Sequence, residues 1–304
     1  MPQLDKRSTR IGYASAILCA ILVGSISTAS KPVLVNSSPL IYASFVYLLA
    51  SLSSIPLGHK AEKSKVQKKD WLIILAITLT GAVIAPILFF IGLKQTTASD
   101  TAVLSNAETI FTVLFALIFF KEKLRPLGYL AVVLVLIGVV IVTTNLQFTN
   151  FLSDIKKEGN LLIILSMAFW ALDNNLSKIV THRINISKIV QLKGAIGGSI
   201  ILIFAYLTGS TINITLIQVP NLLLVGMVGF GVSLYLFLHS LRRIGTVKTV
   251  LIYSTGTIFG LSFASTFLHE VIGVYQIVAV ALMLFGIYVI TKEGGQSVEK
   301  LHEK

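Results

Sequence analysis

The chain alternates between long apolar runs and short polar segments along almost its whole length. The runs are about 20 residues long, the length that a helix needs to cross the hydrocarbon core of a bilayer. They are expected to be helices, because lipid cannot satisfy free backbone groups and the runs are too long for barrel strands. The ten predicted spans are 11–30, 39–57, 71–93, 100–120, 127–145, 160–181, 187–208, 221–241, 246–268 and 272–291.

One segment of the chain, residues 89–143, occurs twice. Moving it forward by 148 positions places it on 237–291 without a gap, and Glu122 then falls on Glu270. The residues before this segment align at an offset of 147. A shared apolar composition does not explain the paired glutamates, so we interpret the chain as two homologous halves.

Each half contains five predicted spans, an odd number, so the second half must enter the membrane upside down relative to the first. Inverted repeats about a pseudo-two-fold axis in the membrane plane are common in secondary transporters. The predicted fold class is therefore an all-α membrane protein with ten transmembrane helices in two inverted five-helix repeats. The predicted domains are a first repeat over 1–145, an outer connecting loop over 146–159, a second repeat over 160–291 and a cytoplasmic tail over 292–304.

Composition and charge agree with a membrane protein. Only 12 % of the residues are charged and the mean hydropathy is +0.86, whereas soluble domains carry roughly 25 % charged residues. With the N-terminus in the cytoplasm, 20 of the 25 Lys and Arg residues fall in inner segments and four in outer ones. This bias predicts a multi-pass protein of the cell membrane with both termini in the cytoplasm. It also explains the net charge of +12 without a nucleic-acid partner.

The sequence contains none of the common motifs of soluble enzymes. It has no GxSxG, HExxH or P-loop motif and no cysteine pair, and its five histidines are scattered. We therefore predict no catalytic residue, no metal ligand and no cofactor, and we do not expect an enzyme. A scaffold for another protein is disfavoured as well, because the polar segments are short. The single cysteine, Cys19, lies in an apolar run and is expected to be a packing residue.

Among the charged residues of the predicted spans, three stand out away from the span ends, namely Glu108, Asp173 and Lys193. A charge in hydrocarbon costs about 3 kcal/mol on insertion scales, so such residues normally face a cavity or a partner. Glu108 lies near the middle of the fourth span, where helical spacing places Ser105 and Thr109 on its face. Two interpretations of Glu108 stay open. It can bind substrate or a proton, or it can be a protonated carboxyl that only ties helices together.

The repeat places Tyr253, Gly256 and Thr257 on the matching face of the ninth span. Two polar faces at matching depth would suit a substrate cavity between the halves. Gly256 stands where the first half has Glu108, and this asymmetry favours a carboxyl that contacts substrate or proton rather than one that supports the scaffold. Asn106 is predicted to lie around the same cavity.

Asp173 and Lys193 are expected to meet as an ion pair. Asp173 lies about eight residues before the end of span six, and Lys193 lies about six residues after the start of span seven. At a rise of about 1.5 Å per residue, the two side chains lie at similar depths in the membrane. Such a pair can be functional or purely structural. Trp170 and Asn174 lie one turn apart and are predicted to line the same cavity, with ordinary packing as the alternative for Trp170.

Spans three and eight both contain residues that interrupt helices. Span three has Gly81 and Pro86, and span eight has Gly226, Gly229 and Gly231. Interruptions at matching positions of two halves indicate a binding site or a hinge. The alternative is close helix packing through small residues.

Glu122 and Glu270 each stand between two consecutive spans. A carboxylate is disfavoured at the end of one helix and favoured at the start of the next, where free amide groups need acceptors. We expect both residues to be structural clips between consecutive helices, with a role in transport as the alternative.

Each half ends in an apolar run, a short segment with a glutamate and a final span with glycine. The two short segments are Lys121-Glu122-Lys123-Leu124 and His269-Glu270-Val271-Ile272. In this arrangement, over nearly all of 11–291, the chain resembles the EamA-type transporters of the drug/metabolite transporter superfamily. The resemblance implies export or exchange of small metabolites, such as amino acids, without ATP and through a central cavity between the halves.

We therefore predict a secondary active transporter that exports small metabolites, such as amino acids or related compounds, by alternating access. The alternative is a facilitative exchanger of a metabolite or a nucleotide-sugar-like solute, without ion coupling. The predicted partners are a small-molecule substrate and the lipid bilayer, with a proton as candidate coupling ion and a monomer or homodimer as the assembly. The predicted substrate-binding residues are Glu108, Asn106, Thr109, Trp170, Asp173, Asn174, Lys193, Tyr253 and Thr257.

Overall fold

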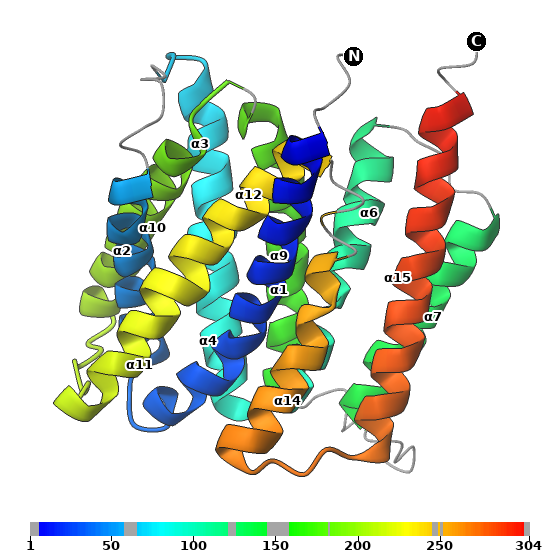
Figure 1. Cartoon of the computed structure of the whole chain (residues 1–304). Helices are drawn as coiled ribbons and strands as arrows, with labels where there is room; N and C mark the ends of the chain where they lie inside the picture. The colour runs from blue at the N-terminus through cyan, green and yellow to red at the C-terminus, as the bar shows by residue number, and fades with distance from the viewer. Residues whose placement is uncertain are drawn as a thin grey trace.

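The protein is described by a computed structural model, in which helices run up and down across the molecule (Figure 1). The structure describes residues 6–57, 66–120, 126–144, 158–181, 183–244, 249 and 252–300. Nearly all of these residues are helical, and no strand occurs among them. The predicted all-α fold is confirmed for this part of the chain.

The helices follow the predicted halves. The first half contains α1 (Lys6–Leu34), α2 (Pro39–Leu57), α3 (Asp70–Leu79), the π-helix η1 (Thr80–Ile84), α4 (Ala85–Gln95), α5 (Ala98–Leu104), α6 (Ala107–Phe120) and α7 (Pro126–Thr144). The second contains α9 (Glu158–Thr181), α10 (Ile186–Leu207), the 3₁₀-helix η3 (Leu216–Gln218), α11 (Val219–Leu223), the π-helix η4 (Leu224–Val232), α12 (Ser233–Ile244), α14 (Gly256–Leu268) and α15 (Val274–Lys300). The last helix therefore continues beyond residue 291, where the final span was expected to end.

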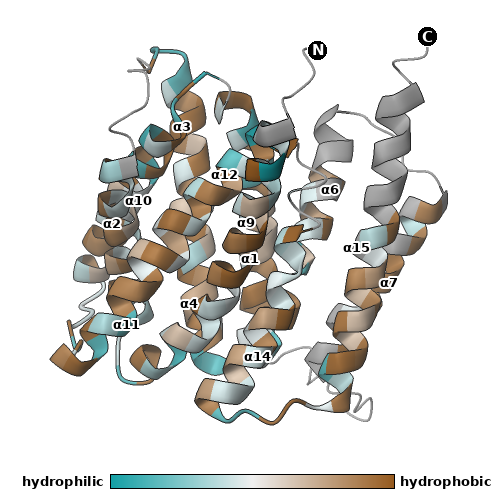
Figure 2. Ribbon diagram, in the orientation of Figure 1, coloured by the Kyte–Doolittle hydropathy of each residue, from teal (hydrophilic) through white to brown (hydrophobic). Residues whose placement is uncertain are grey.

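Several helices have the length and apolarity of membrane spans. Among the described residues, five stretches are long and apolar enough to cross a bilayer: Ser8–Leu34, Pro39–Pro56, Asp70–Gln95, Ile186–Leu207 and Leu216–Ile244. Figure 2 shows apolar residues along the middle of the helices and polar residues near several of their ends. The fourth expected span, 100–120, is not one continuous helix, because α5 ends at Leu104 and α6 begins at Ala107. The full set of ten spans stays a prediction.

The two halves pack against each other reciprocally. Helix α1 packs on α14, and its counterpart α9 packs on α6, the counterpart of α14. In the same way α2 packs on η4, while α10 packs on α3 and η1. The last helices of the two halves, α7 and α15, lie side by side and run in opposite directions (Figure 1). Each of these contacts occurs twice, and the two halves exchange places between the first and the second. A two-fold relation between the halves produces this pattern.

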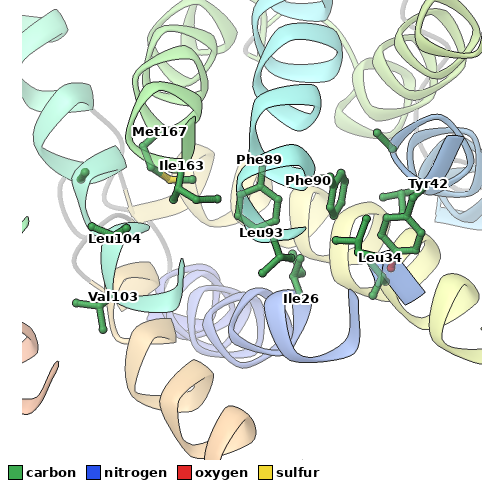
Figure 3. Close-up of a cluster of buried hydrophobic side chains, with 14 of the residues drawn as sticks. Ile26, Leu34, Tyr42, Phe89, Phe90, Leu93, Val103, Leu104, Ile163 and Met167 are labelled. Carbon is green, nitrogen blue, oxygen red and sulfur yellow. The ribbon is translucent and has the colours of Figure 1, made fainter. Parts of the chain in front are cut away.

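The largest hydrophobic core lies where these helices meet. Figure 3 shows side chains from α1, α2, α4, α5 and α9 pointing toward one another. Phe90 from α4 meets Tyr42 from α2 edge-on, with ring centroids 5.0 Å apart. Both halves contribute to this core, so its burial stabilises their association as well as each half.

The π-helices occupy matching positions in the two halves. Moving η1 forward by 148 positions places it on residues 228–232, at the end of η4. In η1 the Ala85 N–H bonds the carbonyl of Thr80, five residues back. The next residue, Pro86, has no N–H, so the carbonyl of Gly81 receives no bond of this type and is open to side chains. The predicted interruptions in spans three and eight are therefore confirmed. Close packing occurs too, since a Cβ on Gly226 would lie 2.7 Å from the Leu49 Cβ.

Glu270 caps a helix other than the one predicted. Its Oε1 accepts the Ala98 N–H at 2.9 Å, and its Oε2 accepts the Ser99 N–H at 2.9 Å and the Ser99 hydroxyl at 2.6 Å. These amides open α5 in the other half, so the expectation of a clip to the next helix was wrong for Glu270. The Gln276 side chain accepts the Gly273 N–H at the start of α15 instead, at 2.8 Å. Glu122 lies outside the described residues.

Candidate functional site

A cavity with about 950 Å³ of free space, its open part included, lies between the two halves. Helices α1, α2, α4, α5, α6, α9, α10, α12 and α14 and both π-helices contribute to its lining. Eight of the nine predicted substrate-binding residues line it: Asn106, Glu108, Trp170, Asp173, Asn174, Lys193, Tyr253 and Thr257. The ninth, Thr109, is buried and lines a smaller hollow of about 140 Å³ beside Glu108.

Thr109 is displaced from the cavity by the break between α5 and α6. Asn106 donates its N–H to the Val103 carbonyl at 3.1 Å, three residues back rather than four. The Thr109 N–H likewise bonds the Asn106 carbonyl at 3.1 Å. The predicted common face therefore holds for Ser105 and Glu108, which both line the cavity, but not for Thr109. The same break places Glu108 in the first turn of α6, where the helix dipole favours a carboxylate.

The Glu108 carboxyl joins the two halves at the cavity wall. Its Oε1 accepts the Asn174 amide at 2.7 Å, and its Oε2 accepts the Tyr253 hydroxyl at 3.1 Å. Both donors belong to the second half, and only 6 % of Glu108 is exposed. Glu108 thus ties helices of the two halves together and also faces the cavity, and its binding of substrate or a proton stays a prediction.

The predicted ion pair between Asp173 and Lys193 is confirmed. The Lys193 Nζ lies 2.5 Å from Asp173 Oδ2, and the Ser177 hydroxyl donates to Asp173 Oδ1 at 3.0 Å. The two side chains are 2 % and 6 % exposed for Lys193 and Asp173. Each charge is therefore matched inside the protein by a partner on the consecutive helix, which a buried pair requires.

Trp170 takes part in a polar contact that the sequence interpretation did not foresee. Its Nε1–H donates to the Gly81 carbonyl at 2.9 Å, and the Tyr47 hydroxyl donates to the same oxygen at 2.7 Å. This is the carbonyl that Pro86 leaves free, so the helix interruption becomes an acceptor on the cavity wall. The sequence interpretation did not include Tyr47. Its only indication was the five-residue spacing from Gly81 to Pro86, which leaves the Gly81 carbonyl in need of a side-chain donor.

Aromatic rings form another part of the cavity wall. Trp170 lies 5.1 Å from Phe89 and 6.1 Å from Phe230, and Phe237 lies 5.3 Å from Tyr253, measured between ring centroids. All five residues line the cavity. The site therefore joins a small set of charged and amide groups to a broad aromatic surface, a combination typical of small-molecule sites.

Asn106 and Thr257 connect the break in the first half to α14. The Thr257 hydroxyl bonds Asn106 Oδ1 at 2.9 Å and the Ala102 carbonyl at 3.1 Å. Ala102 would bond the Asn106 N–H in a regular helix, so Thr257 replaces that lost donor. The neighbouring Gly256 permits a close approach of α1, since a Cβ there would lie 2.8 Å from the Ala20 carbonyl oxygen.

Apolar helices in two reciprocally packed halves, with a polar cavity between them, define the class of multi-pass membrane transporters. Comparison with known proteins agrees with this class. The sequence model of the EamA-like transporter family matches residues 10–144 and 157–292, one copy in each half. The chain belongs to this family.

Relatives carry the same general description. An uncharacterized transporter of Methanothermobacter thermautotrophicus is 29 % identical over 297 residues, which cover 93 % of this chain and 87 % of that one. The uncharacterized transporter YetK of Bacillus subtilis is 20 % identical, and the match covers 89 % of this chain and 82 % of YetK. A solved structure, titled "Crystal structure of protein", matches the fold with a TM-score of 0.67 at 16 % identity, over 94 % of this chain and 97 % of that chain.

Proposed function

We propose that the protein is a secondary active transporter that exports small metabolites, such as amino acids or related compounds, across the cell membrane by alternating access. The observation that carries this proposal is the position of the cavity, whose wall joins Glu108 of one half to Asn174 and Tyr253 of the other. A group held by both halves must change its contacts when the halves move relative to each other.

Reciprocal packing supports alternating access. Because α1 with α14 and α9 with α6 form equivalent contacts, the halves can exchange conformations and reach a second arrangement of similar energy. In this proposal the chain crosses the membrane ten times, has both termini in the cytoplasm and divides into a first repeat over 1–145 and a second over 160–291.

The side chains of the cavity have distinct proposed roles. Glu108 binds either substrate or a proton. Its exchange of one for the other couples substrate movement to proton movement. The Asp173–Lys193 pair supplies a polar surface without a net charge, and Trp170 supplies an apolar one. Asn106 and Thr257 hold the helix break in position beside them.

Reconstitution in proteoliposomes tests the proposal. Vesicles loaded with a mixture of labelled metabolites should release one of them faster than protein-free vesicles, and an imposed pH gradient should change that rate. Glu108→Gln should abolish the effect of the gradient, whereas Ser262→Ala, on an exposed position of α14, should keep it. Unchanged gradient-dependent flux in Glu108→Gln would remove Glu108 from coupling. Counterflow without any gradient would instead identify an exchanger.

A further inference from the structure

The charges that line the cavity do not balance. Its described lining contains two carboxyl groups, Glu108 and Asp173, and a single basic side chain, Lys193. The Lys193 ammonium lies against Asp173 at 2.5 Å, so this pair is neutral as a unit. When Glu108 is ionised, the described lining therefore carries one negative charge without a cation.

Glu108 retains capacity for a further donor. Its two described partners are an amide and a phenol, both neutral, and each occupies one of its oxygens. A carboxylate has about four acceptor positions, so two remain. An ionised carboxylate buried without a cation is costly, and a positively charged ligand that donates to it would remove that cost.

The surroundings suit a cation that carries an apolar body. Trp170, Phe230, Phe237 and Tyr253 line the same cavity. Aromatic faces attract ammonium groups within about 6 Å, and most strongly where water is excluded. The same rings would cover an aryl or alkyl chain attached to the charged group.

A carboxylate on the ligand would find a less suitable environment. Lys193 is the lone basic residue in the described lining, and Asp173 already holds it. Binding a ligand carboxylate there would place a second uncompensated negative charge beside the ionised Glu108, which repels it.

We infer that this cavity recognises its substrate through an ammonium group, with Glu108 as the acceptor, and that it favours monocationic amines with an apolar body over zwitterions and anions. This inference rests on the proposed transport function for its biological role, but binding alone tests it. It narrows the proposed substrate class from small metabolites in general to organic amines, and it disfavours free amino acids, because these also carry a carboxylate.

Three ligands that share one body separate the possibilities. They are 2-phenylethylamine, which has only the ammonium, phenylalanine, which has both charged groups, and 3-phenylpropionate, which has only the carboxylate. Calorimetric titration of the purified full-length protein in detergent would measure their affinities at one pH. We expect 2-phenylethylamine to bind at least about 10-fold more tightly than either of the others, because it alone brings no carboxylate beside Glu108.

Glu108→Gln provides the matched variant, since it keeps the shape of the side chain and removes its charge. It should weaken 2-phenylethylamine binding by about 10- to 100-fold, the range for a lost hydrogen bond to a charged group. Ser262→Ala serves as the control and should bind like the unchanged protein. If Glu108→Gln does not fold, the three-ligand comparison on the unchanged protein still decides the question.

Several results would overturn the inference: no binding of 2-phenylethylamine, binding of 3-phenylpropionate that is equal or tighter, tighter binding of phenylalanine than of the amine, or amine binding that survives in Glu108→Gln. Flux of labelled 2-phenylethylamine, corrected with protein-free liposomes, separates this inference from the proposed function. Binding without flux would contradict transport and leave the recognition of ammonium standing. Flux of another metabolite without amine binding would support transport and contradict the recognition of ammonium.

Discussion

The ammonium of Lys193 and the carboxylate of Asp173 lie 2.5 Å apart on the consecutive helices α10 and α9, and neither is more than 6 % exposed. Removing one partner leaves the other as an unmatched buried charge, which typically costs about 3–5 kcal/mol. We therefore expect Lys193→Gln and Asp173→Asn each to lower the free energy of unfolding by about that amount. Thermal unfolding in detergent would measure the change.

The double variant Asp173→Asn/Lys193→Gln distinguishes a charge effect from a simple loss of packing. Two neutral side chains leave no unmatched charge, so the double variant should be more stable than either single one. Arg183→Gln is the comparison, because Arg183 is 41 % exposed while its partner Asp70 is 3 % exposed. Solvent reaches one side of this pair, so its loss should cost less than the loss of either partner of the fully buried pair. A double variant as unstable as the sum of the singles would contradict this explanation.

The equivalent glycines of the two π-helices should respond differently to substitution. A Cβ on Gly81 would collide with the Asp173 carboxyl, whereas a Cβ on Gly229 would meet the Ile26 side chain at 3.1 Å, a contact that a small shift relieves. Gly81→Ala should therefore disturb the ion pair and reduce both stability and transport, while Gly229→Ala should change them little. Melting temperature and flux, measured on both variants, would check this. Equal effects would show that the π-helical backbone matters more than the neighbouring side chain.

The Gly81 carbonyl has two donors, Tyr47 and Trp170, so losing one should be tolerated. Tyr47→Phe or Trp170→Phe leaves one bond in place, and each should cost about 1 kcal/mol through this contact. The double variant leaves a buried acceptor without a described donor, which adds about 1–3 kcal/mol. A double-mutant cycle of unfolding free energies should therefore show a loss larger than the sum. Simple additivity would mean that water or another group replaces the donors.

Glu270 should control the start of α5 in the opposite half. Glu270→Ala removes the acceptor of two backbone N–H groups, and the loss of such a cap costs about 0.5–2 kcal/mol. Hydrogen exchange measured by mass spectrometry should show faster exchange around Ala98 and Ser99 in the variant. Exchange in α10, which is distant in the chain, should stay unchanged and serves as the internal control. Unaltered exchange at α5 would contradict the cap.

Cys19 offers a direct probe of the cavity. It is the only cysteine of the chain, it lines the cavity, and it is 1 % exposed. Labelling by N-ethylmaleimide should be slow, and a ligand that fills the cavity should slow it further. Mass spectrometry of the intact protein would follow the reaction, with Cys19→Ala as the unlabelled control. A labelling rate that is insensitive to a bound ligand would place that ligand elsewhere.

Several features of the site followed from the sequence because they depend on regular helices. Asp173 and Lys193 were matched by depth, since the rise per residue is constant and a short loop joins spans six and seven. The backbones of α9 and α10 are not packed on each other, because α3 and η1 contact both, and the long Lys193 side chain reaches Asp173. The helix interruptions were visible as Gly81 and Pro86. Each of these arguments needed only local geometry and one reliable connection along the chain.

Other features depend on contacts that local reasoning does not reach. Thr109 was assigned to the cavity on the assumption of an unbroken helix, but the hydrogen bonds at Asn106 shift to three-residue spacing and turn the following side chains. Glu270 was assigned to the next helix, whereas its partners, Ala98 and Ser99, are more than 170 residues away in the chain. Only the packing of one half on the other brings these groups together.

The close passage of α1 past Gly256 has a thermodynamic consequence. Glu108 has no acidic counterpart in the second half, because a Cβ at Gly256 would already lie 2.8 Å from the Ala20 carbonyl oxygen. If the halves exchange conformations, the backbone returns to an equivalent arrangement but the carboxyl does not. The two end states of the cycle must then differ in free energy, and the resting population must favour one side of the membrane. The empty carrier would therefore meet substrate more often from one side of the membrane than from the other.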